Sequence, residues 1–169
     1  TVFLMLSALA ADLSYAIGDL GIIVERMEGA GEVKKCIVCG RFMKVGNIPK
    51  GADATINNIM QESLSARNIG YRKDKNNGNY VNLMLYRYEE RIGGNLSVDK
   101  PAGVGFHMHL MENNTLKRVF TFDEDQQALS ENLFNIGKFF RRGAKWLTVE
   151  ELSIDAINQG LDVILEEHR

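Results

Sequence analysis

The sequence predicts an α/β (α+β) fold, in which helices pack on both faces of a mixed, mainly antiparallel sheet of about four to five strands. Three observations lead to this prediction. Residues 80–122 are typical of three strands of one sheet: a strand over residues 80–90 that is apolar on both faces, and a hairpin over residues 102–122. Apolar residues recur at helical spacing before this block, over residues 53–68, and after it, over residues 148–167. The chain of 169 residues is 45% hydrophobic, which is enough for one domain with a core of its own.

The overall charge argues against one class of function. The chain has a formal net charge of −2 and an isoelectric point of about 5.9. Proteins that bind nucleic acid usually present a strongly basic face. We therefore expect no nucleic-acid partner.

Residues 1–28 are open to two interpretations. The run TVFLMLSALAA has the length of the apolar part of a secretory signal, is too short to span a bilayer, and ends in an Ala-Leu-Ala cleavage signal. This predicts export to the periplasm without a transmembrane segment. The alternative is an amphipathic helix, because apolar residues recur every three or four positions, at Leu13, Ile17, Leu20 and Val24. We therefore divide the chain into a signal-like or amphipathic helical segment, 1–28, and a single α/β domain, 29–169.

The only two cysteines lie in the first predicted strand, over Val33–Met43. Their Cys-x-x-Cys spacing is typical of a redox dithiol or of half a zinc site. Residues three apart in a strand point to opposite faces, however, and no second cysteine pair completes a zinc site. We therefore expect Cys36 and Cys39 to be small buried hydrophobic residues, with no metal and no cofactor.

Residues 102–122 predict a hairpin that turns at Asn113-Asn114, because asparagine tolerates the left-handed backbone that tight turns need. The predicted register pairs His107 with Phe120 and His109 with Arg118.

His107 and His109 share one face of the first hairpin strand and are the candidates for a metal pair. Their predicted neighbours across the hairpin include no carboxylate. We therefore expect hydrogen-bonded imidazoles rather than a metal site.

Exposed charges and one aromatic residue are the candidates for contact with a protein partner. The strand over residues 80–90 ends in charged residues, whose side chains diverge and do not form a catalytic pair. A second charged group precedes the last predicted helix, which begins with a capping box at Thr148 and Glu151. The contact candidates are Arg87, Glu89, Arg141, Arg142 and Trp146.

Several short motifs support a family resemblance. They are Tyr86-Arg87-Tyr88, the run from Pro101 to Phe106, the run from Phe122 to Gln126, the run from Leu129 to Leu133, and the run from Trp146 to Glu151. Together they resemble a group of exported Gram-negative bacterial proteins, many of them lipoproteins of unknown function. That group is similar to the α/β domain of curli-assembly lipoproteins, the TolB N-terminal domain and penicillin-binding-protein activators. The similarity covers about residues 80–165, and this chain lacks the lipobox cysteine.

The resemblance implies a mixed sheet with helices on both faces and a role in envelope protein interactions, with no catalytic residues. We therefore expect a non-enzymatic periplasmic protein, associated with the outer membrane, that binds other envelope proteins. Two alternatives stay open. One is a metal- or thiol-dependent enzyme using His107 and His109 or Cys36 and Cys39. The other is a structural homo-oligomer, assembled through residues 1–28 or through a sheet edge.

Overall fold

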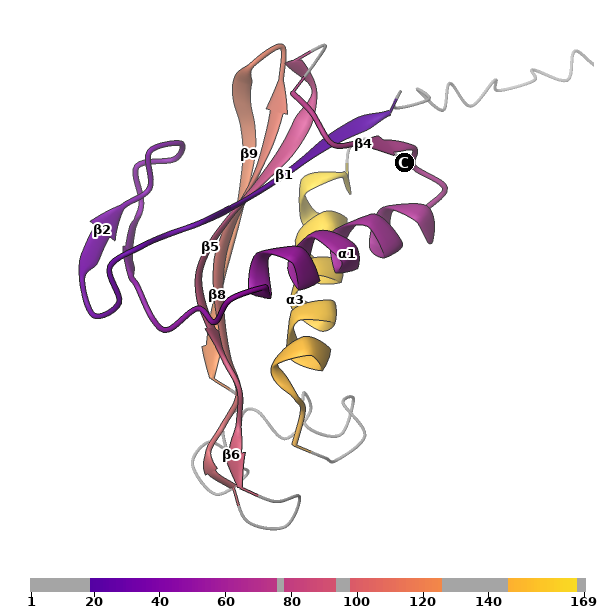
Figure 1. Cartoon of the computed structure of the whole chain (residues 1–169). Coiled ribbons are helices and arrows are strands. Elements are labelled where there is room, and N and C mark those ends of the chain that lie inside the picture. Colours follow the sequence, from indigo (N-terminus) through magenta and orange to yellow (C-terminus); the bar gives the residue numbers. More distant parts are fainter. Residues whose placement is uncertain (1–18, 76–77, 94–97, 126–145, 167–169) are drawn as a thin grey trace, which may run out of the picture.

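The computed structural model describes residues 19–75, 78–93, 98–125 and 146–166. It confirms the predicted fold class: a mixed sheet of five strands carries packed helices (Figure 1). The strand order is β4-β1-β5-β8-β9, in which β4, β1 and β5 run parallel while β8 and β9 continue antiparallel. The strands are β1 (Leu20–Arg26), β4 (Tyr71–Arg72), β5 (Tyr80–Glu89), β8 (Gly103–Glu112) and β9 (Thr115–Asp125).

Two antiparallel pairs of short strands lie outside this sheet. One joins β2 (Val33–Lys35) to β3 (Phe42–Lys44), and the other joins β6 (Ile92–Gly93) to β7 (Val98–Lys100). The helices are α1 (Ala52–Ser65) and α3 (Val149–Ile164). The predicted capping box begins α3: the Thr148 hydroxyl accepts from the backbone of Glu151, whose carboxylate accepts from the backbone of Thr148.

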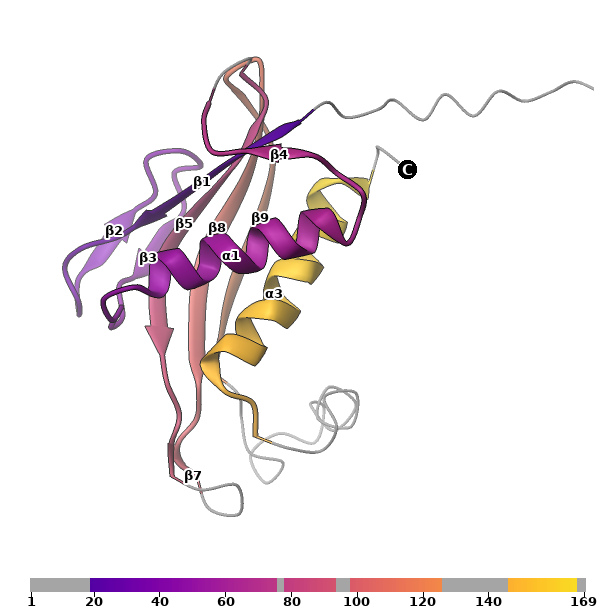
Figure 2. The ribbon, with the colours of Figure 1, turned by 45° about the vertical axis from the view of Figure 1, so that its right-hand side comes forward.

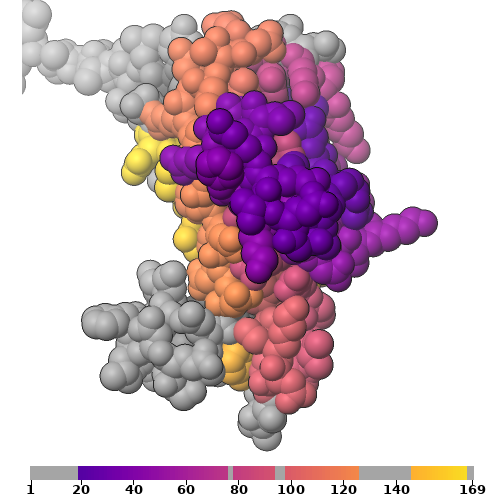
Figure 3. Space-filling model, turned by 90° about the vertical axis from the view of Figure 1, so that its left-hand side faces the viewer, coloured from indigo at the N-terminus to yellow at the C-terminus, as the bar shows by residue number. Residues whose placement is uncertain are grey.

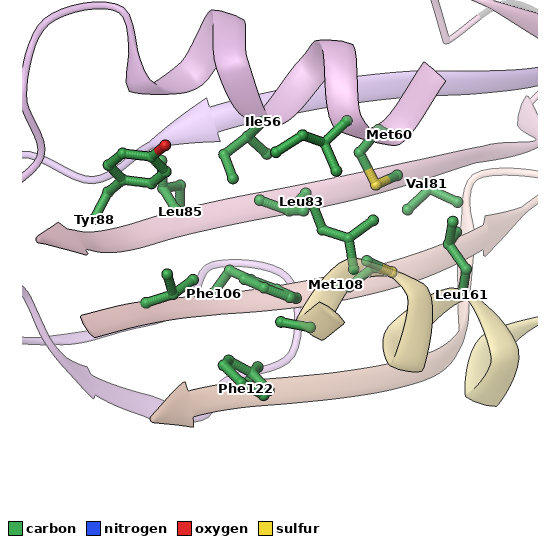
Figure 4. Packing of buried hydrophobic residues seen from close by; sticks show 14 of the residues in the cluster. Ile56, Met60, Val81, Leu83, Leu85, Tyr88, Phe106, Met108, Phe122 and Leu161 are labelled. Atoms are coloured by element: carbon green, nitrogen blue, oxygen red, sulfur yellow. The ribbon is translucent and has the colours of Figure 1, made fainter. Parts of the chain in front are cut away.

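The two described helices lie together on one face of the sheet (Figure 2). Ile56 and Met60 of α1 and Leu161 of α3 join the same apolar core as Leu83 and Met108 of the central strands (Figure 4). Helices are predicted on the opposite face as well, but neither described helix covers it. There the β2–β3 hairpin lies against the sheet, on the side away from the helices (Figure 1).

The amphipathic helix predicted as one alternative for residues 1–28 is wrong where the structure describes the chain. Residues 20–26 form β1, which lies between β4 and β5 and pairs in parallel with residues 80–85. A short apolar run such as Leu-Gly-Ile-Ile-Val fits either a buried strand or a helical turn. Here pairing with β5 makes it a strand. Residues 1–18 lie outside the described part.

The single strand predicted over Val33–Met43 is also wrong. The chain turns back over Cys36–Cys39, and two three-residue strands replace one long strand. The turn closes through a bond from the Gly40 amide to the Cys36 carbonyl, 2.9 Å. Gly40 has φ 73°, a conformation that glycine adopts without a Cβ penalty. This glycine is the signal that ends the strand.

The predicted turn at Asn113 and Asn114 is confirmed, with φ of 50° and 59°. The predicted partners of His107 and His109 are wrong by one residue, because an irregularity between Leu110 and Met111 shifts the ladder beyond that point. As a result His107 lies opposite Thr121, and His109 lies opposite Val119. Among the described residues, neither helix is long and apolar enough to cross a membrane.

Candidate metal centre

Two cysteines and two histidines come together between the hairpin and the sheet. The ligand atoms of Cys36, Cys39, His107 and His109 all lie within 4.8 Å of one another. The cysteines come from the turn between β2 and β3, and the histidines come from the middle of β8. This arrangement overturns the expectation that the two sulfur atoms point to opposite faces, because that expectation required a strand through Cys36–Cys39.

We call the turn over residues 36–41 the knuckle. Its backbone hydrogen bonds hold both sulfurs on one side: the Cys36 amide donates to the Arg41 carbonyl at 2.8 Å. Burial raises the pKa of the Cys39 thiol, and the bond that the Arg41 amide donates to the Cys39 sulfur acts in the opposite direction. A turn of this kind supplies two adjacent thiolates, which zinc binds well.

Two sulfur–nitrogen distances in the cluster fit one tetrahedral ion. Cys36 Sγ lies 3.5 Å from His109 Nε2, and Cys39 Sγ lies 3.5 Å from His107 Nδ1. Zinc–sulfur bonds near 2.3 Å and zinc–nitrogen bonds near 2.05 Å at tetrahedral angles place S and N about 3.6 Å apart. The observed separations therefore match the edge of a zinc tetrahedron.

His109 is oriented from behind by the neighbouring strand. Asn82 of β5 lies directly opposite it in the ladder, and the backbone and side-chain oxygens of Asn82 both lie 3.2 Å from His109 Nδ1. A proton on Nδ1 that bonds to these oxygens leaves Nε2 free for a metal. The Asn82 amide in turn donates to Glu25 at 2.9 Å, and Glu25 lies 3.7 Å from Lys75.

His107 is held by aromatic packing instead. Its ring meets Tyr86 edge to face, with centroids 5.3 Å apart, and Tyr86 donates its hydroxyl proton to the Phe122 carbonyl at 3.1 Å. Arg41 of the knuckle donates to the Thr121 hydroxyl on the far side, at 3.3 Å. The Tyr86 contact positions the His107 ring from β5, and the Arg41 bond ties the knuckle to β9.

The protonation states suit metal binding. Burial lowers the pKa of His109 to about 4, against the raising effect of its bond to Asn82. Burial and the charge of Arg41 lower the pKa of His107 as well. Both rings are therefore neutral near pH 7, the form that binds metals. Burial raises the pKa of the Cys39 thiol, a preference that a bound divalent cation reverses.

The cluster is closed rather than open to substrate. His107, His109 and Cys36 are at most 3% exposed, and Cys39 is half-buried. Four protein ligands fill a tetrahedral ion, whereas catalytic zinc sites keep a position for water. The donor set of two sulfurs and two nitrogens favours Zn²⁺ over Mg²⁺ or Ca²⁺, which prefer oxygen ligands.

The other predicted site residues lie elsewhere. Arg87 forms ion pairs with Asp123 and Asp125 of β9. Glu89 binds Lys100 at 2.7 Å. The Trp146 carbonyl accepts a bond from Arg91 at 2.9 Å. The remaining two candidates, Arg141 and Arg142, lie outside the described residues.

Comparisons with known proteins show likeness in fold. No family model and no curated protein matches this sequence. A PelC dodecamer from Paraburkholderia phytofirmans has a TM-score of 0.52 and 12% identity, over 85% of this chain and 87% of that one. Protein XCC0632 of the DUF330 family, from Xanthomonas campestris, has a TM-score of 0.48 and 7% identity, over 91% and 90% of the two chains. At such identities the likeness to PelC concerns the fold alone.

Proposed function

We propose that this protein binds one zinc ion through Cys36, Cys39, His107 and His109, and that the ion has a structural role in a non-enzymatic envelope protein. The approach of four ligand atoms to within 4.8 Å carries this proposal. The two pairs are separated by about seventy residues, 73 between Cys36 and His109. Thiol–imidazole hydrogen bonds join the four groups in two separate pairs, whereas one ion bound to all four would join them in a single site.

The β2–β3 hairpin needs a further contact to hold it against the sheet. Its strands have three residues each, and a two-stranded hairpin alone is marginally stable in water. Its apolar contact with the sheet is small: Cys36 and Met43 pack on Tyr86, with Met27 and Val38 at the margin. A zinc ion shared between the knuckle and β8 would supply the missing stabilisation.

Metal analysis of the purified protein tests the proposal. We expect one equivalent of zinc by mass spectrometry of the metal content. Cobalt substitution is expected to produce the visible absorption of a tetrahedral ion with thiolate ligands. Cys36→Ser, Cys39→Ser, His107→Ala and His109→Ala should each remove tight binding, because three ligands hold zinc far less strongly than four.

His168→Ala is the matched control, since His168 is the third histidine of the chain and is not among the four proposed ligands. It should retain one zinc ion. Retention of full affinity by the Cys36→Ser and His109→Ala variants would contradict the proposed site.

The proposed location in the cell envelope rests on evidence separate from the metal site. The apolar run at residues 1–11 and the resemblance of residues 80–165 favour export to the periplasm, and other envelope proteins are the proposed partners. Homo-oligomerisation is a second candidate, favoured by the PelC fold likeness and by the sheet edge: β9 is eleven residues long and ends the strand order. Light scattering tests it, and a monomeric mass would end this candidate.

Partner contacts at Arg87, Glu89, Arg141, Arg142 and Trp146 also remain proposals. The internal ion pairs of Arg87 and Glu89 favour a structural role for these two side chains. A metal-dependent enzyme is less favoured, because the cluster has four protein ligands and little exposure.

A further inference from the structure

We propose that the β2–β3 hairpin docks this protein onto an anionic lipid surface, and that the zinc ion holds the docking face in place. The docking face consists of Val33, Lys35, Ile37, Phe42 and Lys44. The orientation of this face rests on the proposed zinc site, but the residues that make up the face do not depend on the ion.

The ladder of the hairpin places four of these five residues together. Val33 pairs with Lys44 and Lys35 pairs with Phe42, so alternation puts all four side chains on one face. The opposite face carries Met43, which is buried against the sheet. The docking face therefore points away from the protein.

The apolar side chains on this face are strongly exposed. Ile37 at the knuckle is 85% exposed, Phe42 is 73% exposed and Val33 is 68% exposed. Figure 3 shows the hairpin as a raised mass over the sheet. A convex apolar projection can enter the headgroup layer of a bilayer, whereas isolated apolar residues on a flat surface cannot.

The charge within the hairpin itself is positive. Residues 33–45 contain four cations and no carboxylate, although the whole chain has a net charge of −2. A zinc ion with two thiolate ligands adds no net charge to the knuckle. Lys34 turns away to Glu32, with 3.2 Å between them, while Lys35 and Lys44 flank the exposed Phe42 and Val33. This combination of lysine and apolar side chains fits an anionic bilayer.

Vesicle sedimentation of the zinc-loaded protein tests the proposal. We expect binding to vesicles of phosphatidylcholine with phosphatidylglycerol, weaker binding at high salt, and none to phosphatidylcholine alone. Lys35→Gln with Lys44→Gln should weaken binding by about 25-fold, since each lysine near an anionic surface contributes about fivefold. Ile37→Ser with Phe42→Ser should also release the protein.

Ile154→Ser and Lys50→Gln are the matched controls, because both residues are exposed away from the hairpin. They should bind like the wild type. All hairpin variants should keep one zinc ion, which shows that the knuckle is intact. Failure of the zinc-loaded wild type to sediment with anionic vesicles would overturn the proposal.

Further measurements distinguish lipid from other binding partners and test the role of the metal. Light scattering that shows a dimer dissociated by Ile37→Ser with Phe42→Ser, without vesicle binding, would assign the face to a second copy. Binding of a single-stranded oligonucleotide in place of vesicles would assign it to nucleic acid; either result overturns the lipid proposal. Vesicle binding by a protein that holds no zinc would support the docking face and overturn the role of zinc in holding it in place.

Discussion

Asn82 lies directly opposite His109 in the β5–β8 ladder, with its two oxygens each 3.2 Å from His109 Nδ1. The backbone oxygen is present whatever residue occupies position 82, while the amide oxygen depends on asparagine. The Asn82 amide group also links the ring to Glu25. This contact sets which histidine nitrogen faces the two sulfurs.

Asn82→Ala should therefore weaken zinc binding without abolishing it. Loss of a hydrogen bond behind a ligating histidine typically lowers metal affinity by about 10- to 100-fold. Competition with a chromophoric chelator measures the change. Asn58→Ala, on the exposed side of α1, is the control and should leave the affinity unchanged. Equal affinities for Asn82→Ala and the wild type would show that Asn82 does not position His109.

Removal of the metal should loosen the hairpin before the core. A ligand at 1,000 times its dissociation constant stabilises the native state by about 4 kcal/mol, so chelation should lower the melting temperature. Hydrogen exchange should show faster exchange over residues 31–45, while the α3 amides stay protected by the apolar core. Uniform loss of protection across the chain would contradict a local role for the ion.

Gly160 of α3 should resist substitution, although alanine is the better helix former by about 1 kcal/mol. A Cβ atom there would lie 2.8 Å from Phe120 and 3.0 Å from Met108. Gly160→Ala should therefore destabilise the protein by about 1–3 kcal/mol, through overpacking of the helix against the sheet. Denaturant unfolding measures this, and Gln159→Ala, one residue earlier and exposed, should change stability by less than about 0.5 kcal/mol. A more stable Gly160→Ala variant would show that α3 can move off the sheet.

Glu89 should contribute stability that depends on pH. Burial raises its pKa, but the bonds from Lys100 and from the Asn47 amide outweigh that effect and lower the pKa below 4.5. The contribution is therefore fully present above pH 4.5 and is lost as the pH falls through the folded pKa.

Comparison of the wild type with Glu89→Gln at several pH values tests this expectation. The difference in stability should be about 0.5–1 kcal/mol at pH 7 and should shrink below pH 4. Glu62→Gln, on α1 and outside this ion pair, should show no such trend. A difference that grows on acidification would refute the assignment.

The sequence contains the proposed metal site as two separate halves. Cys36-x-x-Cys39 has no second cysteine pair beside it, and the predicted neighbours of His107-x-His109 include no carboxylate. Two ligands from each half complete a tetrahedral set only where the fold brings the halves together. The signal that could have joined them is Gly40, which follows the second cysteine and favours a turn over a strand.

Local chemistry was enough to predict β5, the Asn113 turn and the capping box of α3, because alternation, left-handed asparagine and reciprocal end bonds act within a few residues. The chain itself thus determined the mixed sheet and its β8–β9 hairpin. Only the tertiary structure decided that residues 20–26 form a strand beside β5 and that the knuckle meets β8. The reason is physical: pairing and ligation between segments about 60 to 70 residues apart depend on which surfaces the folded sheet leaves uncovered, and no local pattern encodes that.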